Sequence, residues 1–320
     1  MASIRELLSS PTSREASTEP SAVGQDEDTV MVDVDSETPT FTVEFILDLI
    51  CPYCYIGLKN LERAMVRYRE SRPEATFKVS FLPYQLDPLA ARSAYDKADY
   101  LDYLLGRPHT AEYWINLGQQ AGITIHWDGR TGNTRDAHKL LLWALDPNLR
   151  TVRRTARAAL TPSSPHSTAS SPSSSSASAP APRDVTNGNG YGPPRPHGPA
   201  LQLLLAHALL SAHHARDTDL SSRASLTLLV SSATGHPASE VRTVVESEDW
   251  GRVVDALIAD VTNPLGLAVR AVPTLVVNGR FVIGGLQSAE FLVGEFGRIA
   301  GSRGGVERRG DSEGEGEGGV

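Results

Sequence analysis

The chain has 320 residues, a formal net charge of −8 and two cysteines. Its length allows one or two domains, and the negative charge, without a basic stripe carrying interleaved aromatics, argues against a general nucleic-acid-binding protein. No apolar run reaches the roughly 18 residues that a membrane-spanning helix needs, so we expect neither nucleic acid nor a membrane among the partners.

Both ends of the chain have compositions typical of disorder. Residues 1–39 are rich in Ser, Thr, Pro, Asp and Glu, and residues 301–320 are mostly Gly, Glu, Arg and Ser, so we predict two disordered tails. The first residues lack the apolar stretch of a secretory signal. A single pair of cysteines fits a reducing compartment. We therefore expect a cytoplasmic protein, with the nucleus left open.

The first folded part, residues 40–95, is predicted to form a β-α-β unit. Residues 41–47 are β-rich and become continuously apolar, which indicates a buried central strand. Residues 55–72 have apolar side chains at helical spacing, and residues 77–84 alternate as a second strand. A connection of this length implies that the two strands are parallel and that the crossover is right-handed.

The tetrapeptide Cys51-Pro52-Tyr53-Cys54 joins the first strand to the helix and contains both cysteines of the chain. Proline is tolerated in the first helical turn, where the N–H groups have no intrahelical partner. The helix N-terminus carries partial positive charge, which favours a reactive thiolate. We expect Cys51 to attack a disulfide and Cys54, one turn later, to resolve the mixed disulfide, with Pro52 and Tyr53 as supporting residues.

Two other interpretations of the cysteine pair are a buried, inert pair of thiols and one half of a metal site. Two cysteines are too few for a four-cysteine zinc site, and none of the nine histidines lies at close ligand spacing to the pair. We therefore expect no metal.

Residues 96–262 are predicted to form a helical subdomain. The helical stretches that we expect are 97–122, 134–145, 200–215, 220–233, 239–245 and 250–261. A low-complexity segment, residues 161–199, interrupts them, and ten of its first twenty residues are Ser. Such a segment buries too little apolar area to offset its ordering entropy, so we predict a disordered insert.

Residues 263–300 return to strands. Residues 271–277 and 280–284 are β-rich and flank Asn278-Gly279, the strongest short signal for a hairpin. Residues 288–300 are predicted as a closing helix. The order β-α-β, helical block, β-β-α predicts an α/β fold with a mixed sheet interrupted by a helical insertion subdomain.

Three stretches carry a family resemblance. They are residues 48–57 around the cysteine pair, Asn133-Thr134 with Ala137-His138, and Val272-Pro273-Thr274. With these motifs the chain resembles the thioredoxin superfamily and, within it, the DsbA-like branch. It is most similar to the FrnE-type group, which is related to 2-hydroxychromene-2-carboxylate isomerase and kappa-class glutathione transferase. Tyr53 stands where this group usually has Trp.

The resemblance implies a thioredoxin-like fold in which Pro273 is cis and packs against the active-site disulfide. It also implies that the backbone of Val272 is free to pair with an extended substrate. Asn133 and His138 are candidates for a substrate crevice, although a helix cap and a structural histidine are equal accounts of them. Asp48 is either a proton acceptor for the resolving thiol or a polar residue that ends the strand.

The leading interpretation is a DsbA-like thiol–disulfide oxidoreductase that acts on protein or small-molecule thiols and disulfides through its own redox-active disulfide, without another cofactor. The resemblance also raises a glutathione-dependent isomerase or transferase with glutathione as co-substrate. Against that reading, such relatives commonly have Ser at the position of Cys51. A third reading is a binding module without enzymatic activity. The sequence does not predict the natural substrate, the direction of the reaction or the oligomeric state.

Overall fold

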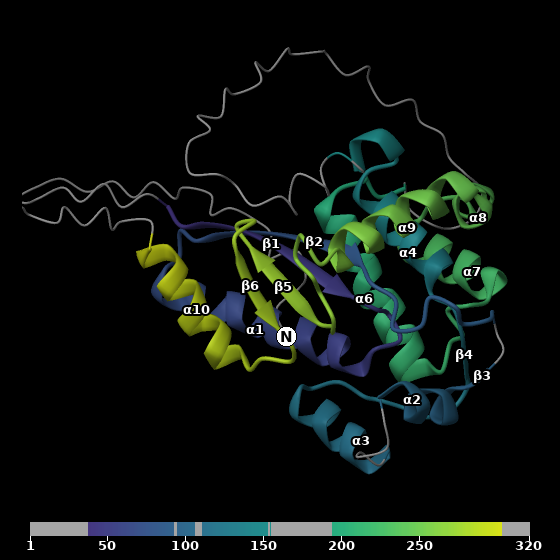
Figure 1. Cartoon of the computed structure of the whole chain (residues 1–320), viewed down its shortest axis with the longest axis horizontal. Coiled ribbons are helices and arrows are strands. Elements are labelled where there is room, and N and C mark those ends of the chain that lie inside the picture. The colour runs from purple at the N-terminus through teal and green to yellow at the C-terminus, as the bar shows by residue number, and fades with distance from the viewer. Residues whose placement is uncertain (1–37, 93–94, 106–110, 153, 155–193, 303–320) are drawn as a thin grey trace, which may run out of the picture.

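The computed structural model describes residues 38–92, 95–105, 111–152, 154 and 194–302 (Figure 1). The predicted tails and most of the predicted insert lie outside these ranges. The described elements are β1 (Thr40–Leu47), α1 (Pro52–Ser71), β2 (Thr76–Pro83), β3 (Tyr95–Asp96), α2 (Lys97–Leu105), α3 (Ala111–Gln120), β4 (Arg130–Thr131), α4 (Arg135–Leu145), α6 (Pro199–Arg216), α7 (Arg223–Thr234), α8 (Ala238–Glu246), α9 (Glu248–Thr262), β5 (Thr274–Val277), β6 (Phe281–Gly284) and α10 (Ala289–Gly301).

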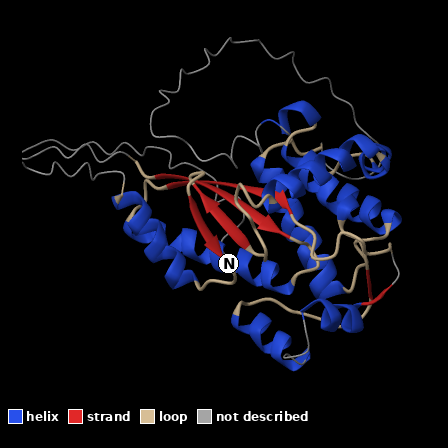
Figure 2. Ribbon diagram, in the orientation of Figure 1, coloured by secondary structure: helices blue, strands red, loops and turns tan. Residues whose placement is uncertain are grey.

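The main sheet has four strands in the order β2-β1-β5-β6 (Figure 2). β1 and β2 are parallel, whereas β5 is antiparallel to both β1 and β6. The prediction of an α/β fold with a mixed sheet is confirmed. The predicted hairpin is also present: Val277 pairs with Phe281, and the turn residues Asn278 and Gly279 between them have left-handed φ angles of 54° and 62°.

Aromatic side chains form the core between the sheet and the helices α1 and α10. Phe41 of β1 stacks on Phe77 of β2 with ring centroids 4.9 Å apart. Tyr68 of α1 and Phe296 of α10 meet the Phe41 ring at 5.4 and 5.1 Å. Figure 1 shows the two helices side by side on this face of the sheet. Burial of such large apolar groups is the main favourable contribution to folding here.

The helical block lies beside the edge strand β2. An edge strand has unpaired backbone groups that need partners. Gln202 of α6 supplies them at Phe81: its side chain accepts a hydrogen bond from the N–H of Phe81 at 3.0 Å and donates one to the carbonyl of Phe81 at 3.1 Å. Gln202 is fully buried, so this pair of bonds fixes α6 to the sheet.

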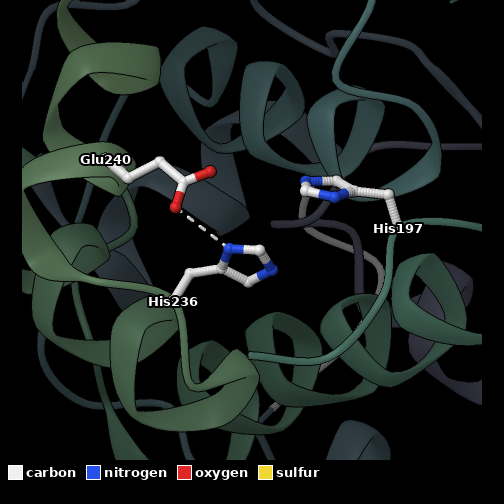
Figure 3. Close-up of side chains that lie close together, drawn as sticks. All are labelled: His197, His236 and Glu240. Carbon is white, nitrogen blue, oxygen red and sulfur yellow. Dashed lines mark hydrogen bonds and ion pairs between the residues drawn. The ribbon is translucent and has the colours of Figure 1, made fainter. Parts of the chain in front are cut away.

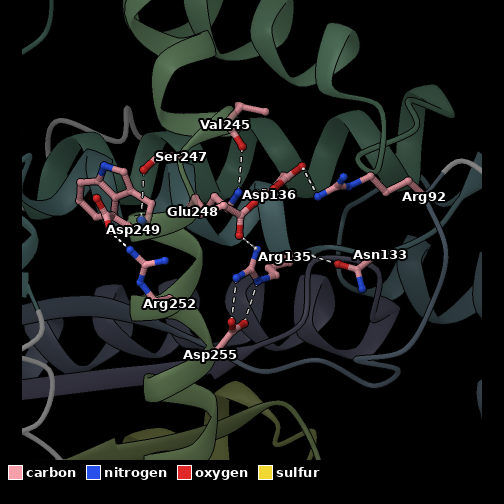
Figure 4. Close-up of polar contacts among 12 residues, drawn as sticks. Arg92, Asn133, Arg135, Asp136, Val245, Ser247, Glu248, Asp249, Arg252 and Asp255 are labelled. Atoms are coloured by element: carbon pink, nitrogen blue, oxygen red, sulfur yellow. Dashed lines mark hydrogen bonds and ion pairs between the residues drawn. The ribbon is translucent and has the colours of Figure 1, made fainter.

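Charged residues at the start of α4 join it to α9 (Figure 4). The guanidinium of Arg135 donates to both carboxylate oxygens of Asp255 at 2.8 and 2.7 Å. The next residue, Asp136, forms ion pairs with Lys139 at 2.6 Å and Arg92 at 3.2 Å. Asp136 and Lys139 are both buried, so each charge depends on its partner.

The helical block differs from the prediction in three places. Residues 97–122 form two helices, α2 and α3, and the sequence between them contains Pro108, which cannot continue a helix. The short pair β3–β4 was not predicted. The predicted insert ends early, because Arg195 donates its N–H to the carbonyl of Thr234 at 3.1 Å and α6 already begins at Pro199.

In the described part of the chain, none of the helices combines the length and the apolar character that a membrane crossing requires.

Candidate active site

The two cysteines lie at the N-terminus of α1, where the chain leaves the end of β1. Cys51 is the N-cap residue, with φ −80° and ψ 114°, and Pro52 is the first helical residue. The N–H of Cys51 donates to the carbonyl of Asp48 at 3.1 Å, and the N–H of Cys54 donates to the carbonyl of Cys51 at 3.0 Å. Cys51 therefore occupies the end of the helix that stabilises negative charge.

The loop before β5 completes this site from the other end of the chain. The Sγ atom of Cys51 lies 3.7 Å from the carbonyl oxygen of Val272. The Val272–Pro273 peptide bond is cis, the configuration that the resemblance implies. Pro273 packs on α1 at Gly57, where a Cβ atom would lie 2.9 Å from the Cγ atom of the proline. The close approach of α1 to this loop thus depends on a residue without a side chain.

The two thiols are buried to a similar extent: Cys51 is 1% exposed and Cys54 is 0% exposed. Burial, followed by the hydrogen bond with Cys51, raises the pKa of the Cys54 thiol well above its ordinary value. In the reduced protein, Cys54 therefore favours the protonated thiol over the thiolate. Both cysteines are free thiols in this structure.

Asp48 and His138 form a second buried layer behind the cysteines. One carboxylate oxygen of Asp48 accepts a hydrogen bond from the N–H of Leu86 at 2.8 Å. The other lies 3.7 Å from Nε2 of His138, beyond hydrogen-bond distance, and neither of these two atoms has a hydrogen-bond partner among the described residues. The negative charge of Asp48 is one of the smaller contributions that raise the pKa of Cys54.

The residues predicted to line a substrate crevice have structural contacts. His138 is 1% exposed, so it lies behind the site rather than on its surface. The side-chain oxygen of Asn133 accepts a hydrogen bond from the N–H of Arg135 at 2.9 Å at the start of α4, and its amide donates to the carbonyl of Pro88 at 3.2 Å. A role of Asn133 and His138 in substrate binding stays a prediction.

An aromatic group covers the helix N-terminus. Tyr53 meets the buried Trp114 of α3 with ring centroids 4.5 Å apart, and Trp114 stacks on Trp127 at 5.8 Å. Burial and a hydrogen bond with Tyr113 raise the pKa of Tyr53 to about 12, so its hydroxyl stays protonated at neutral pH. Sequence reasoning recognised Tyr53 but missed Trp114, which carries no signal beyond an apolar position on a helix.

Among the described residues, neither cysteine belongs to a group of three His, Cys, Asp or Glu side chains that could hold a metal ion. The arrangement is instead suited to exchange between thiols and a disulfide, because two thiols one helical turn apart meet at a helix N-terminus.

Comparisons with known proteins agree with the fold of this chain. The sequence profile described as the DSBA-like thioredoxin domain matches residues 42–176, which is less than half of the chain. No curated protein matches the sequence. A probable DsbA oxidoreductase from Streptomyces coelicolor has a similar structure, with a TM-score of 0.53, 20% identity, and coverage of 82% of this chain and 91% of that one. At this identity the similarity concerns the fold alone.

Two further structures are more distantly similar. A candidate protein disulfide isomerase from Nitrosomonas europaea has a TM-score of 0.48 and 11% identity, with coverage of 83% of this chain and 100% of that one. A 2-hydroxychromene-2-carboxylate isomerase has a TM-score of 0.46 and 12% identity, with coverage of 82% and 98%. We draw no inference from these two.

Proposed function

This chain carries a DsbA-like thioredoxin domain, and we propose from this that it is a thiol–disulfide oxidoreductase in which Cys51 attacks and Cys54 resolves. The observation that carries the proposal is the position of the only two cysteines of the chain. Both lie at the N-terminus of α1, Cys51 as the N-cap residue and Cys54 in the first turn, and Cys51 faces the carbonyl oxygen of Val272 at 3.7 Å.

The proposed reaction is a pair of exchanges. The Cys51 thiolate attacks one sulfur of a substrate disulfide, the substrate S–S bond breaks, and a mixed disulfide forms between Cys51 and the substrate. Cys54 then loses its proton and attacks the Sγ atom of Cys51, which releases the second substrate sulfur. The substrate gains two electrons and two protons, and the enzyme is left with a Cys51–Cys54 disulfide. The reverse sequence oxidises a dithiol.

The different environments of the two thiols support this division of roles. Cys51 lies at the helix N-terminus, whereas burial keeps Cys54 protonated until it is needed. The carboxylate of Asp48 is buried and its charge acts on Cys54, and we propose that it accepts the proton when Cys54 attacks.

The surroundings of Val272 suggest how a protein substrate approaches. Arg270 and Ala271 are exposed, and Val272 and Pro273 turn into the site beside Cys51. An extended segment of a substrate that pairs with this backbone would bring its disulfide to Cys51. Tyr53 is partly exposed and rests on the buried Trp114, so it supplies an apolar surface on the side of α3.

The test is reduction of insulin by dithiothreitol in the presence of the purified full chain. We expect a faster rate than dithiothreitol gives alone, loss of the effect in Cys51→Ser, and accumulation of mixed disulfides in Cys54→Ser. Unchanged activity in Cys51→Ser would overturn the proposal. A parallel titration with glutathione at millimolar concentration examines the alternative of an isomerase or transferase, which requires saturable binding of glutathione. Membership of the FrnE-type group stays a prediction from the motifs.

A further inference from the structure

A second group of polar side chains lies in the helical block, apart from the cysteines. It consists of His197 just before α6, His236 in the turn between α7 and α8, and Glu240 in α8 (Figure 3). One ligand atom from each residue lies within 4.8 Å of the other two. Figure 3 shows the two imidazole rings and the carboxylate around one common space.

The hydrogen bonds of His236 leave one of its nitrogens facing a carboxylate. Nε2 lies 2.9 Å from the carbonyl oxygen of Arg195, which only accepts, so Nε2 must carry the proton of this bond. In the neutral ring Nδ1 then has a lone pair, and it lies 3.1 Å from the Oε2 atom of Glu240. Two acceptors at this distance need a cation between them, either a proton or a metal ion.

His197 adds a further lone pair to this space. Its Nε2 atom is buried and has no hydrogen-bond partner among the described residues. Leaving such a buried atom without a partner destabilises the folded protein. The ring is held in place: its centroid lies 4.7 Å from that of Trp143 and 4.8 Å from that of His236. Trp143 also packs at 4.7 Å against His236, so one buried indole orients both histidines.

We propose that His197, His236 and Glu240 bind a divalent transition-metal ion, and that Zn²⁺ is the ion that they fit best. Two imidazole nitrogens and one carboxylate oxygen, with water as a fourth ligand, form a common zinc ligand set. Zinc–ligand bonds of about 2.0–2.1 Å place tetrahedral ligand atoms about 3.3 Å apart. The His236–Glu240 separation of 3.1 Å already matches this value.

The backbone contact of His236 is the one expected around a metal site. Histidine ligands usually donate their second ring N–H to a carbonyl or carboxylate, which fixes the tautomer, and the Arg195 carbonyl has this position. Because Glu240 is exposed, the remaining coordination position faces water. A bound ion would tie the segment before α6 to α8, and it would stabilise the helical block independently of the reaction at the cysteines.

The binding test uses the full chain with Cys51→Ser and Cys54→Ser, because the two thiols also bind zinc. After removal of metal with a chelator, Zn²⁺ is titrated against a chromophoric competitor. We expect one ion per chain and a loss of affinity of at least about tenfold in His197→Ala and in Glu240→Gln. Glu240 is exposed, so Glu240→Gln tests the site without disturbing the core.

His126→Ala is the matched control. Nδ1 of His126 lies 3.2 Å from Asp217, so it forms a similar histidine–carboxylate pair, but the described residues provide no third ligand there. This variant is expected to bind zinc like the parent. Ni²⁺ gives a second readout, because it should quench Trp143 and lose that effect in Trp143→Phe.

A rise in melting temperature with Zn²⁺ in the parent and not in Glu240→Gln would support the site. The absence of saturable binding by the parent would overturn it, as would unchanged affinity in both His197→Ala and Glu240→Gln. In that case the group is a protonated His236 paired with Glu240.

Discussion

The Sγ atom of Cys51 lies 3.7 Å from the carbonyl oxygen of Val272, although 221 positions separate the two residues in the sequence. The contact exists because β5 pairs with β1 and brings the residues before Thr274 to the end of β1 that leads into the cysteines. The helix N-terminus and the proline loop therefore meet at the same end of the two central strands, β1 and β5. The environment of the thiols is complete only when β1 and β5 have paired.

The first prediction concerns which thiol reacts with an alkylating agent. Because burial raises the pKa of Cys54, the reduced protein near pH 7 should take up iodoacetamide at Cys51 first. The rate should be slower than in urea, since Cys51 is only 1% exposed. Peptide mass spectrometry locates the label. Modification of Cys54 before Cys51 would contradict the assignment of roles.

The second prediction concerns the contact between α1 and Pro273. Replacing Gly57 with Ala places a Cβ atom 2.9 Å from the Cγ atom of Pro273, so the loop must move. Overpacking of this kind typically costs about 1–3 kcal/mol, and we expect a similar loss of stability together with lower reductase activity. Gly294→Ala is the control: a Cβ there meets nothing within 4 Å, and the exchange should be neutral or stabilise α10 by up to about 1 kcal/mol. Urea denaturation separates these outcomes, and equal effects of the two substitutions would contradict the packing argument.

Local sequence patterns predicted the elements that have strong periodicity or turn chemistry. The strand before Cys51, the helix after it and the hairpin at Asn278-Gly279 all lie where the pattern placed them, because apolar alternation and left-handed turn residues act over a few positions. The contact of Val272 with Cys51 entered only through a resemblance, since no local pattern encodes a pairing across the whole chain.

Other features of the site depend on packing that the sequence does not reveal. Trp114 is an ordinary apolar helix residue until α3 is placed on Tyr53. His138 and Asp48 become neighbours only when α4 lies behind the cysteines. Similarly, His236 and Glu240 have the spacing of neighbours on a helix, but nothing in the sequence links them to His197.

The third prediction concerns the proton acceptor in the resolving step. Asp48→Asn keeps the shape of the side chain and an oxygen that accepts from the N–H of Leu86, but it removes the charge. We expect normal formation of the mixed disulfide and slower resolution by Cys54, by about 100-fold if Asp48 acts as a general base. Rapid-quench kinetics with a peptide disulfide measure both steps, and the deficit should shrink at high pH. Resolution at the parental rate would exclude this role.

The fourth prediction concerns the buried ion pair of α4. Burial alone would raise the pKa of Asp136, but its contacts with Arg223 and Lys139 lower it below the ordinary value. Asp136→Ala leaves the ammonium of Lys139, which is 0% exposed, without its counter-ion, and should cost about 3–5 kcal/mol. Asp255→Asn breaks a more exposed pair with Arg135 and should cost about 1 kcal/mol or less. Equal losses in urea denaturation would contradict this difference.

The last prediction concerns the pH dependence of stability through Glu44 of β1. Burial raises the pKa of this carboxyl group from its ordinary value of 4.5 to about 7, and its Oε2 atom has no hydrogen-bond partner among the described residues. The folded state therefore holds a proton that the unfolded state releases, and the stability contributed by this proton is complete below about pH 4.5 and is lost as the pH rises through 7. Glu44→Gln keeps a neutral side chain at every pH. The free energy of unfolding of the parent, relative to Glu44→Gln, should fall between pH 5 and pH 8 by at most about 3 kcal/mol. Other titrating groups are the same in both proteins, so their contributions cancel in the difference. A difference that does not change with pH would show that Glu44 is already ionised in the folded protein at pH 5.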